Sequence, residues 1–269
     1  MVKETVKVAA VQMVSTPVVE ENIATARCLV AQAASQGAQL VLLPEYWPIM
    51  GMSEADKVAH AEQPDAGPIQ QCMSDIAREQ RVWLIGGTLP LASAEPGKVL
   101  NTTLVYDPAG QRVSRYDKIH LFSFAKGEES YDEARTIVHG KEVSTFDAPF
   151  GRVGLSVCYD LRFPELYRAM GDCALIVMSA AFTYTTGKAH WEILLRARAI
   201  ENQCYVLAAA QGGKHRNGRR TWGHSMLVDP WGEVKDVLPE GEGLVIGDIE
   251  PHHLHGVRES LPALKHRKL

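Results

Sequence analysis

Hydrophobic positions in the first half of the chain alternate between strand-like runs and stretches with helical spacing. Strands are expected at residues 6–14, 40–43, 82–89 and 100–106, because each is a short, β-rich apolar run. Between the strands, apolar residues recur every three or four positions, which is typical of a helix packed on one face. These helical positions are Ile23, Ala26, Val30 and Ala33, and then Ile69, Cys72, Met73 and Ile76.

The second half of the chain repeats this alternation. Strands are expected at 153–157, 174–179, 204–210 and 225–228. Helix faces are expected between them, marked by Phe163, Leu166, Tyr167 and Met170, and then by Trp191, Leu194 and Leu195. Each half also ends a strand in an Asp-Pro-x-Gly turn, at 107–110 and at 229–232, so the two turns lie 122 residues apart (229 − 107).

Two similar α/β halves predict two sheets packed face to face with helices outside, a four-layer α-β-β-α sandwich. One doubly wound sheet is the alternative, but hairpins after the parallel units favour the sandwich. No linker-like segment divides the halves, so we expect a single domain over residues 1–269.

Charge and cysteine content narrow the class of protein. The net charge of −4 argues against a general nucleic-acid binder. The five cysteines are odd in number and no two are spaced as CxxC, which fits neither a disulfide framework nor a zinc site and indicates a reducing compartment. The chain begins without an apolar leader and has no run of about 18 apolar residues, so we expect a cytoplasmic protein with no membrane contact.

Three segments end a strand with a chemically useful residue. Glu45 follows Leu-Leu-Pro, Lys118 lies in Tyr-Asp-Lys-Ile-His, and Cys158 stands between an apolar strand and a helix start. A thiol at such a turn lies beside backbone N–H groups that the new helix leaves unsatisfied. An ammonium could lower the pKa of that thiol and later donate to an oxyanion, while a carboxylate could move the proton from the thiol to a leaving amine.

The segments around these residues resemble the nitrilase superfamily of carbon–nitrogen hydrolases. The resemblance runs from Val6 to Leu261 and rests on several strings. They are Leu43-Pro44-Glu45, the YDKIHLF segment at 116–122, the CYDLRFPEL segment at 158–166, TGKAHWE at 186–192, RARAIENQ at 196–203, WGHS at 222–225 and DPWG at 229–232. Taken alone, Cys158 would be interpreted as a small buried apolar residue and Lys118 as a solvated charge. Their joint placement in these strings favours catalysis.

The resemblance implies a role for each position. Glu45 would be the general base and then the acid, Lys118 the oxyanion donor and Cys158 the acylated nucleophile, with the backbone N–H of Tyr159 completing the oxyanion hole. A second glutamate would order the lysine or the substrate. Glu128, Glu129 and Glu133 compete for that role, and the frame of Glu133 fits the family pattern best. Further candidates for substrate binding are Arg162, Phe182, Thr183 and His190.

Within the superfamily, the chain is most similar to amidases that hydrolyse deaminated glutathione to 2-oxoglutarate and cysteinylglycine. Next come ω-amidases of 2-oxo-dicarboxylate monoamides, and then carbamoyl-amine hydrolases. A small anionic amide as substrate needs positive partners, and we hypothesise that one or more of Arg216, Arg219 and Arg220 provide them. The alternative for these arginines is a solvated surface loop.

The resemblance also implies an enzyme without a cofactor or metal that forms at least a homodimer, because family members pair through the helices after the cysteine. Charged residues on two apolar helices, such as Arg198 and Glu201, are expected to form ion pairs at that contact. The three histidines at 252, 253 and 255 are a weak metal pattern. Two other classes remain open, a non-catalytic binding protein and a thiol redox sensor with a resolving cysteine near Cys158.

Overall fold

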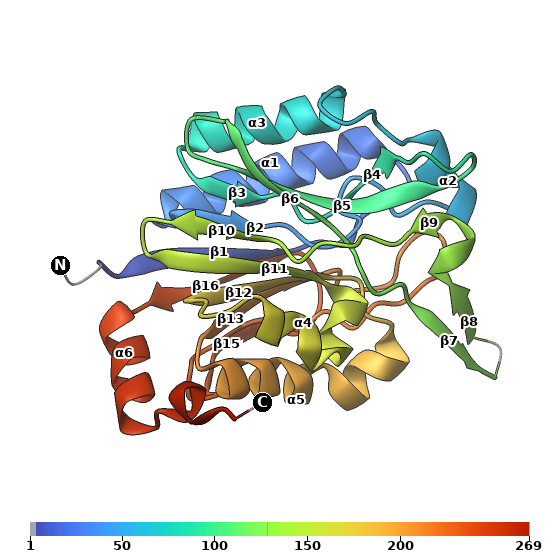
Figure 1. Cartoon of the computed structure of the whole chain (residues 1–269). Helices are drawn as coiled ribbons and strands as arrows, with labels where there is room; N and C mark the ends of the chain where they lie inside the picture. Colours follow the sequence, from blue (N-terminus) through green and yellow to red (C-terminus); the bar gives the residue numbers. More distant parts are fainter. Residues whose placement is uncertain (1–3, 128, 269) are drawn as a thin grey trace.

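The computed structural model describes residues 4–127 and 129–268, and most of its strands form two sheets that pack face to face (Figure 1). The strands of the first sheet are β1 (Val6–Gln12), β2 (Leu40–Leu42), β3 (Trp83–Ile85), β4 (Leu89–Ala92), β5 (Val99–Tyr106), β6 (Arg112–Asp117), β9 (Ile137–Val138) and β16 (Gly243–Ile249). Their order is β16-β1-β2-β3-β5-β4, and β6 and β9 also pair with β5.

The second sheet follows the order of the sequence. Its strands are β10 (Thr145–Ala148), β11 (Gly151–Val157), β12 (Leu175–Ala180), β13 (Tyr205–Ala210), β14 (Ser225–Val228) and β15 (Val234–Leu238). A separate hairpin of β7 (Ser123–Lys126) and β8 (Glu129–Asp132) projects from the body of the molecule (Figure 1).

Helices cover the outer faces of both sheets (Figure 1). The α-helices are α1 (Val19–Ser35), α2 (Glu54–Ala59), α3 (Pro68–Gln80), α4 (Pro164–Ala169), α5 (Tyr184–Asn202) and α6 (Pro251–Ser260). Short 3-10 turns are η1 (Glu133–Arg135), η2 (Cys158–Arg162) and η3 (Ala263–His266). Helices α1 and α3 lie on the first sheet, and α4 and α5 lie on the second. In the part of the chain that the structure describes, we find no helix with the length and hydrophobicity to span a bilayer.

Strand β1 shows why the layers form in this way. Its residues alternate, so Val8 and Ala10 join the core between the two sheets, whereas Ala9 and Val11 pack in the core under α1 and α3. Both faces of the strand are therefore buried, as a parallel sheet covered on both sides requires. The prediction of a four-layer α-β-β-α sandwich is confirmed.

The internal repeat extends to the pairing of the strands. The series β16-β1-β2-β3-β5-β6 and β10-β11-β12-β13-β14-β15 share the same sequence of antiparallel, parallel, parallel, antiparallel and antiparallel pairs. The two Asp-Pro-x-Gly turns also match. Asp107 Oδ1 accepts the N–H groups of residues 109 and 111, and Asp229 Oδ1 accepts those of residues 231 and 233.

Two predicted elements differ from the observed ones. The expected strand at 82–89 is divided into β3 and β4, because the chain bends at Gly86 and Gly87. Gly87 has a φ of 52°, and a Cβ on it would lie 2.0 Å from the carbonyl oxygen of Pro44. The bend thus allows a close approach to the segment that carries Glu45. The helix around Trp191 is also longer than expected and begins at Tyr184.

Candidate active site

Glu45 lies just beyond the end of β2, and its side chain is only 1% exposed. The next residue, Tyr46, has a φ of 55°, and its N–H donates to Thr88 Oγ1 over 2.9 Å. Both oxygens of the Glu45 carboxylate accept hydrogen bonds. Oε1 accepts from Asn101 Nδ2 and Oε2 from the backbone N–H of Ala181, both over 2.9 Å. The carboxylate is therefore fixed from both sheets.

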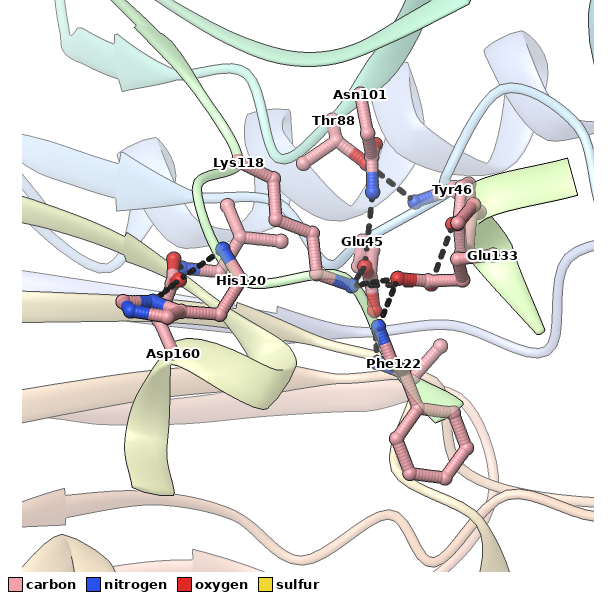
Figure 2. Close-up of polar contacts among 12 residues, drawn as sticks. Glu45, Tyr46, Thr88, Asn101, Lys118, His120, Phe122, Glu133 and Asp160 are labelled. Carbon is pink, nitrogen blue, oxygen red and sulfur yellow. Dashed lines mark hydrogen bonds and ion pairs between the residues drawn. The ribbon is translucent and has the colours of Figure 1, made fainter. Parts of the chain in front are cut away.

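Lys118 follows β6 and lies fully buried between two carboxylates (Figure 2). Its Nζ donates to Glu45 Oε1 over 2.9 Å and to the two oxygens of Glu133 over 3.0 and 2.8 Å. Burial by itself would lower the pKa of this lysine, but Glu133 and Glu45 outweigh burial and raise it well above its ordinary value. The side chain is therefore a permanent ammonium.

Glu133 begins the 3-10 turn η1 and is 9% exposed. It accepts from Tyr46 Oη over 2.9 Å and from the backbone N–H of Phe122 over 2.7 Å (Figure 2). Burial raises the pKa of Glu133, but the contacts with Lys118 outweigh burial, and the net shift of the pKa is downward. Of the competing glutamates, Glu128 lies outside the described residues and Glu129 lies in the projecting strand β8. Glu133 is thus the glutamate that the structure brings to Lys118.

Cys158 follows β11 at the start of η2 and is 7% exposed. Its φ of 51° is unusual for a residue with a side chain, and such strained backbone is typical of functional turns. Burial raises its pKa well above the ordinary value and Glu45 adds to this, while Lys118 acts in the opposite direction. Lys118 thus lowers the pKa of the thiol as expected, but burial and Glu45 outweigh this effect. A neutral thiol needs a base at the moment of attack.

Asp160 connects the turn of Cys158 with the segment of Lys118. Its fully buried carboxylate accepts from Tyr116 Oη over 2.7 Å, from the N–H of Val157 over 2.9 Å and from the N–H of His120 over 3.1 Å. The Nδ1 of His120 also lies 2.7 Å from Asp160 Oδ1 (Figure 2). This carboxylate therefore holds the end of β6 in the first sheet next to the end of β11 in the second sheet.

A small pocket opens beside the thiol, and several predicted residues line it. The lining residues are Phe122, Glu133, Cys158, Tyr159, Arg162, Ala181, Phe182, Thr183, Thr186 and Arg219. His190, by contrast, does not line this pocket. It lies exposed in the middle of α5, with its Nδ1 3.2 Å from Arg162 Nη1, because the helix begins six residues before it. Its expected contact with substrate is replaced by a contact with Arg162.

The three arginines of the 216–220 loop have different surroundings. Arg216 pairs with Glu21 over 2.9 Å, and Arg220 pairs with Glu240 over 2.7 Å. Arg219 lines the pocket, and its Nη2 donates to the carbonyl oxygen of Ala181 over 3.0 Å. The hypothesis of an arginine from this loop is therefore narrowed to Arg219.

Sequence reasoning missed several residues that complete the site. Asn101 lies within β5 and Ala181 just after β12, and both bind Glu45. Neither residue type suggests this function, because a strand asparagine and a backbone N–H carry no motif. Asp160 could have been singled out, since it is an acidic residue two positions after the cysteine, just beyond an apolar strand.

The alternatives raised from the sequence find little support in the site. In residues 4–127 and 129–268, no group of three or more histidine, cysteine or acidic residues has the arrangement of a metal site. His253 instead contacts Asp229 Oδ2 over 2.9 Å. Apart from Cys158, none of the described residues that line the pocket is a cysteine, so a redox sensor would lack a resolving thiol there.

Comparisons with known proteins identify the family of this chain. The family model of the carbon-nitrogen hydrolases matches residues 7–259. The chain is 41% identical to a deaminated glutathione amidase of Yersinia enterocolitica, over 97% of this chain and 92% of that protein. It is 38% identical to an omega-amidase of Mus musculus, over 98% and 95% of the two chains.

A solved structure of Saccharomyces cerevisiae Nit3, described as a member of the nitrilase superfamily, matches with a TM-score of 0.88. The match has 28% identity and covers 100% of this chain and 98% of that one. The matched region contains both halves of the sandwich and every residue of the site described above. The chain therefore belongs to the carbon-nitrogen hydrolase family of the nitrilase superfamily and is a hydrolase of carbon–nitrogen bonds other than peptide bonds.

Proposed function

We propose that this protein is a cysteine amidase in which Cys158, Glu45 and Lys118 carry out the reaction. The observation that carries the proposal is the position of the Lys118 ammonium, which makes hydrogen bonds to Glu45 and Glu133 and acts electrostatically on the Cys158 thiol. A nucleophile, a proton carrier and a fixed positive charge are the parts that amide hydrolysis requires.

Acylation begins when the sulfur of Cys158 attacks the amide carbonyl carbon and its proton passes to Glu45. The negative charge that develops on the carbonyl oxygen is stabilised by Lys118 and by the N–H of Tyr159, which lies in the first turn of η2 and has no partner within that turn. Glu45 then gives the proton to the leaving nitrogen, the C–N bond breaks, and the amine departs from a thioester on Cys158.

Deacylation uses the same groups in reverse. A water molecule gives its proton to Glu45 as its oxygen attacks the thioester carbon, and the new oxyanion is held by the same two donors. The C–S bond then breaks, and the proton of Glu45 returns to the sulfur. Glu133 keeps Lys118 charged and oriented throughout, since it makes two of the three hydrogen bonds of the ammonium.

For the substrate, we propose deaminated glutathione, which is cleaved at its internal amide to 2-oxoglutarate and cysteinylglycine. The relative with 41% identity carries that activity in its name, whereas the omega-amidase has 38% identity. The substrate is a dianion, and the pocket has two guanidinium groups, Arg162 and Arg219, with no carboxylate partner among the described residues. Arg162 is suited to a carboxylate of the acyl half.

The substrate is tested by assaying deaminated glutathione and 2-oxoglutaramate side by side, with release of 2-oxoglutarate as the signal. We expect kcat/KM for deaminated glutathione to be at least about 10-fold higher, as one additional charge-assisted contact provides. A preference for 2-oxoglutaramate would make the protein an ω-amidase. Cys158→Ser is the negative control, and turnover by that variant comparable to the wild type would refute the proposed mechanism.

We further propose a cytoplasmic homodimer that needs no cofactor and binds no nucleic acid. Support for a dimer comes from α5, on whose surface Ile193 is 70% exposed and Ile200 50% exposed. The expected role of Arg198 in such a contact is not needed, because its guanidinium already donates to the carbonyl oxygen of Leu161 and to Glu201 within the chain. Sedimentation of the purified protein would measure its oligomeric state.

A further inference from the structure

A second pocket adjoins the one beside the thiol, and the two share Arg219. We call them the outer pocket and the inner pocket. The outer pocket is the larger, and its walls come from the segment after β2, from α2, from Tyr131 and from the loop at 217–219. Arg219 thus stands at the boundary between the catalytic cysteine and a larger polar space.

The charges of the outer pocket leave Arg219 uncompensated. Lys57 and Glu54 both line this pocket, but they form an ion pair with each other. For Arg219, the described residues provide one side-chain hydrogen bond, from Nη2 to the carbonyl of Ala181, and a ring contact with Tyr131 at 5.3 Å. Its Nε is buried without a hydrogen-bond partner among them. Buried donors are normally satisfied, so this guanidinium is prepared for an acceptor that enters from outside the chain.

The order of the reaction decides which half of an amide reaches this boundary. The amine must depart before water attacks the thioester, so its half has to lie on the side that opens outward. The acyl half stays attached to Cys158 in the inner pocket, where Arg162 is available and the outer pocket does not extend. The amine half therefore points past Arg219.

We propose that the outer pocket is the subsite for the amine half of the substrate and that Arg219 binds a carboxylate on that half. This inference rests on the proposed amidase function and deepens it, because it assigns selection between peptide-like and ammonia-releasing amides to one residue. A guanidinium at the boundary favours amides whose amine carries an anionic group. Amides that release ammonia have nothing to place there.

The experiment compares Arg219→Gln with the wild-type enzyme on two substrates that share an acyl half. Deaminated glutathione has a glycine carboxylate on its amine half, whereas 2-oxoglutaramate has only NH₂. We expect kcat/KM of the variant to fall about 10- to 100-fold on deaminated glutathione, mainly through KM, since a hydrogen bond to a charged group is lost. On 2-oxoglutaramate we expect a change of less than about 3-fold.

A change in the substrate provides the matching control. Deaminated glutathione whose glycine carboxylate is converted to a carboxamide should be a poor substrate for the wild-type enzyme, and Arg219→Gln should reduce its turnover no further. Arg219→Lys should recover part of the loss, because it restores the charge. Arg220→Ala should behave as the wild type, since Arg220 pairs with the exposed Glu240.

The results separate this inference from the proposed function. If the wild-type enzyme hydrolyses deaminated glutathione and Arg219→Gln does so equally well, the subsite is refuted and the amidase remains. An equal loss of kcat/KM on deaminated glutathione and on 2-oxoglutaramate would also refute the subsite. Arg219 would then bind the acyl half that the two substrates share, or only the carbonyl of Ala181. If the wild-type enzyme hydrolyses none of the three substrates, the proposed function and the inference are refuted together.

Discussion

The two halves of the molecule share one series of parallel and antiparallel strand pairs, but different chemical groups follow the strands in each half. Each has an antiparallel edge strand, three parallel strands and two further antiparallel strands, with a matched Asp-Pro-x-Gly turn. In the first half, β2 and β6 lead into Glu45 and Lys118. In the second half, β11 leads into Cys158, and the N–H after β12 binds Glu45.

This difference shows that neither half contains a complete site. Glu45 and Lys118 come from the first sheet and Cys158 comes from the second, so only the packing of the two sheets brings the three side chains together. Contacts at Asp160 and at Ala181 cross between the halves and help to hold these side chains together.

Removal of the positive charge of Lys118 should have the largest effect on stability and activity. Lys118→Met would leave Glu45 and Glu133 buried side by side without a cation, so we expect the free energy of unfolding to fall by about 3–5 kcal/mol. Activity should fall by about 10³-fold or more, because the oxyanion loses a donor as well. Urea unfolding and turnover measure the two effects.

The matched control is Lys7→Met, which removes a partly exposed ion pair with Asp248 in the same half. Its effect on unfolding should be below about 1 kcal/mol. If Lys118→Met were as stable as this control, Lys118 would not hold the two carboxylates together.

Neutralising the first half's acid should abolish proton transfer but preserve the fold. Glu45→Gln keeps an oxygen for Lys118 or Ala181, and we expect kcat to fall by about 10²- to 10⁴-fold with little change in thermal stability. Glu62→Gln is the control, because Glu62 is a buried carboxylate of the same half that binds the start of α3. Full activity of Glu45→Gln would exclude a role in proton transfer.

Acid should weaken the connection between the halves through His215. Its Nδ1–H donates to the carbonyl of Ser15, which leaves Nε2 to accept from Thr221 Oγ1, and burial lowers its pKa to about 4. A neutral buried histidine stabilises the fold above its ordinary pKa of 6.5, and this contribution is lost as the pH falls toward 4. We expect a loss of about 3 kcal/mol over that range, measured by urea unfolding.

The comparison variant is His215→Asn, which cannot gain a proton in this range. Its stability should be lower than that of the wild type at pH 7, and the difference should shrink as the pH falls. Parallel curves for the two proteins would show that His215 does not titrate during acid unfolding.

Loosening the contact at Asp160 should have the smallest effect. Asp160→Asn replaces one acceptor oxygen with a donor between Tyr116 and His120, so kcat should fall about 10-fold while KM changes little. Tyr116→Phe removes one of the same bonds and should show a smaller loss. A change confined to KM would indicate that Asp160 acts on substrate binding instead.

Local patterns in the sequence predict the strands, their repetition and the candidate residues Glu45, Lys118 and Cys158, because alternating apolar runs and strand-end motifs are local properties of the chain. The sequence by itself could not determine the break at Gly86–Gly87, where the chain passes close to the carbonyl of Pro44, more than forty residues away. It also could not place Asn101 or the N–H of Ala181 beside Glu45, since neither carries a motif.

The electrostatics of the site depend on the folded arrangement of its residues. Lys118 lowers the pKa of the thiol as the sequence predicts, but burial and Glu45 raise it by more, so the net shift is upward. The tertiary structure likewise selected Arg219 from three neighbouring arginines, since the partners of the other two lie in distant parts of the chain. The electrostatic environment and the burial of a group depend on what surrounds it in space. The order of residues along the chain does not specify those surroundings.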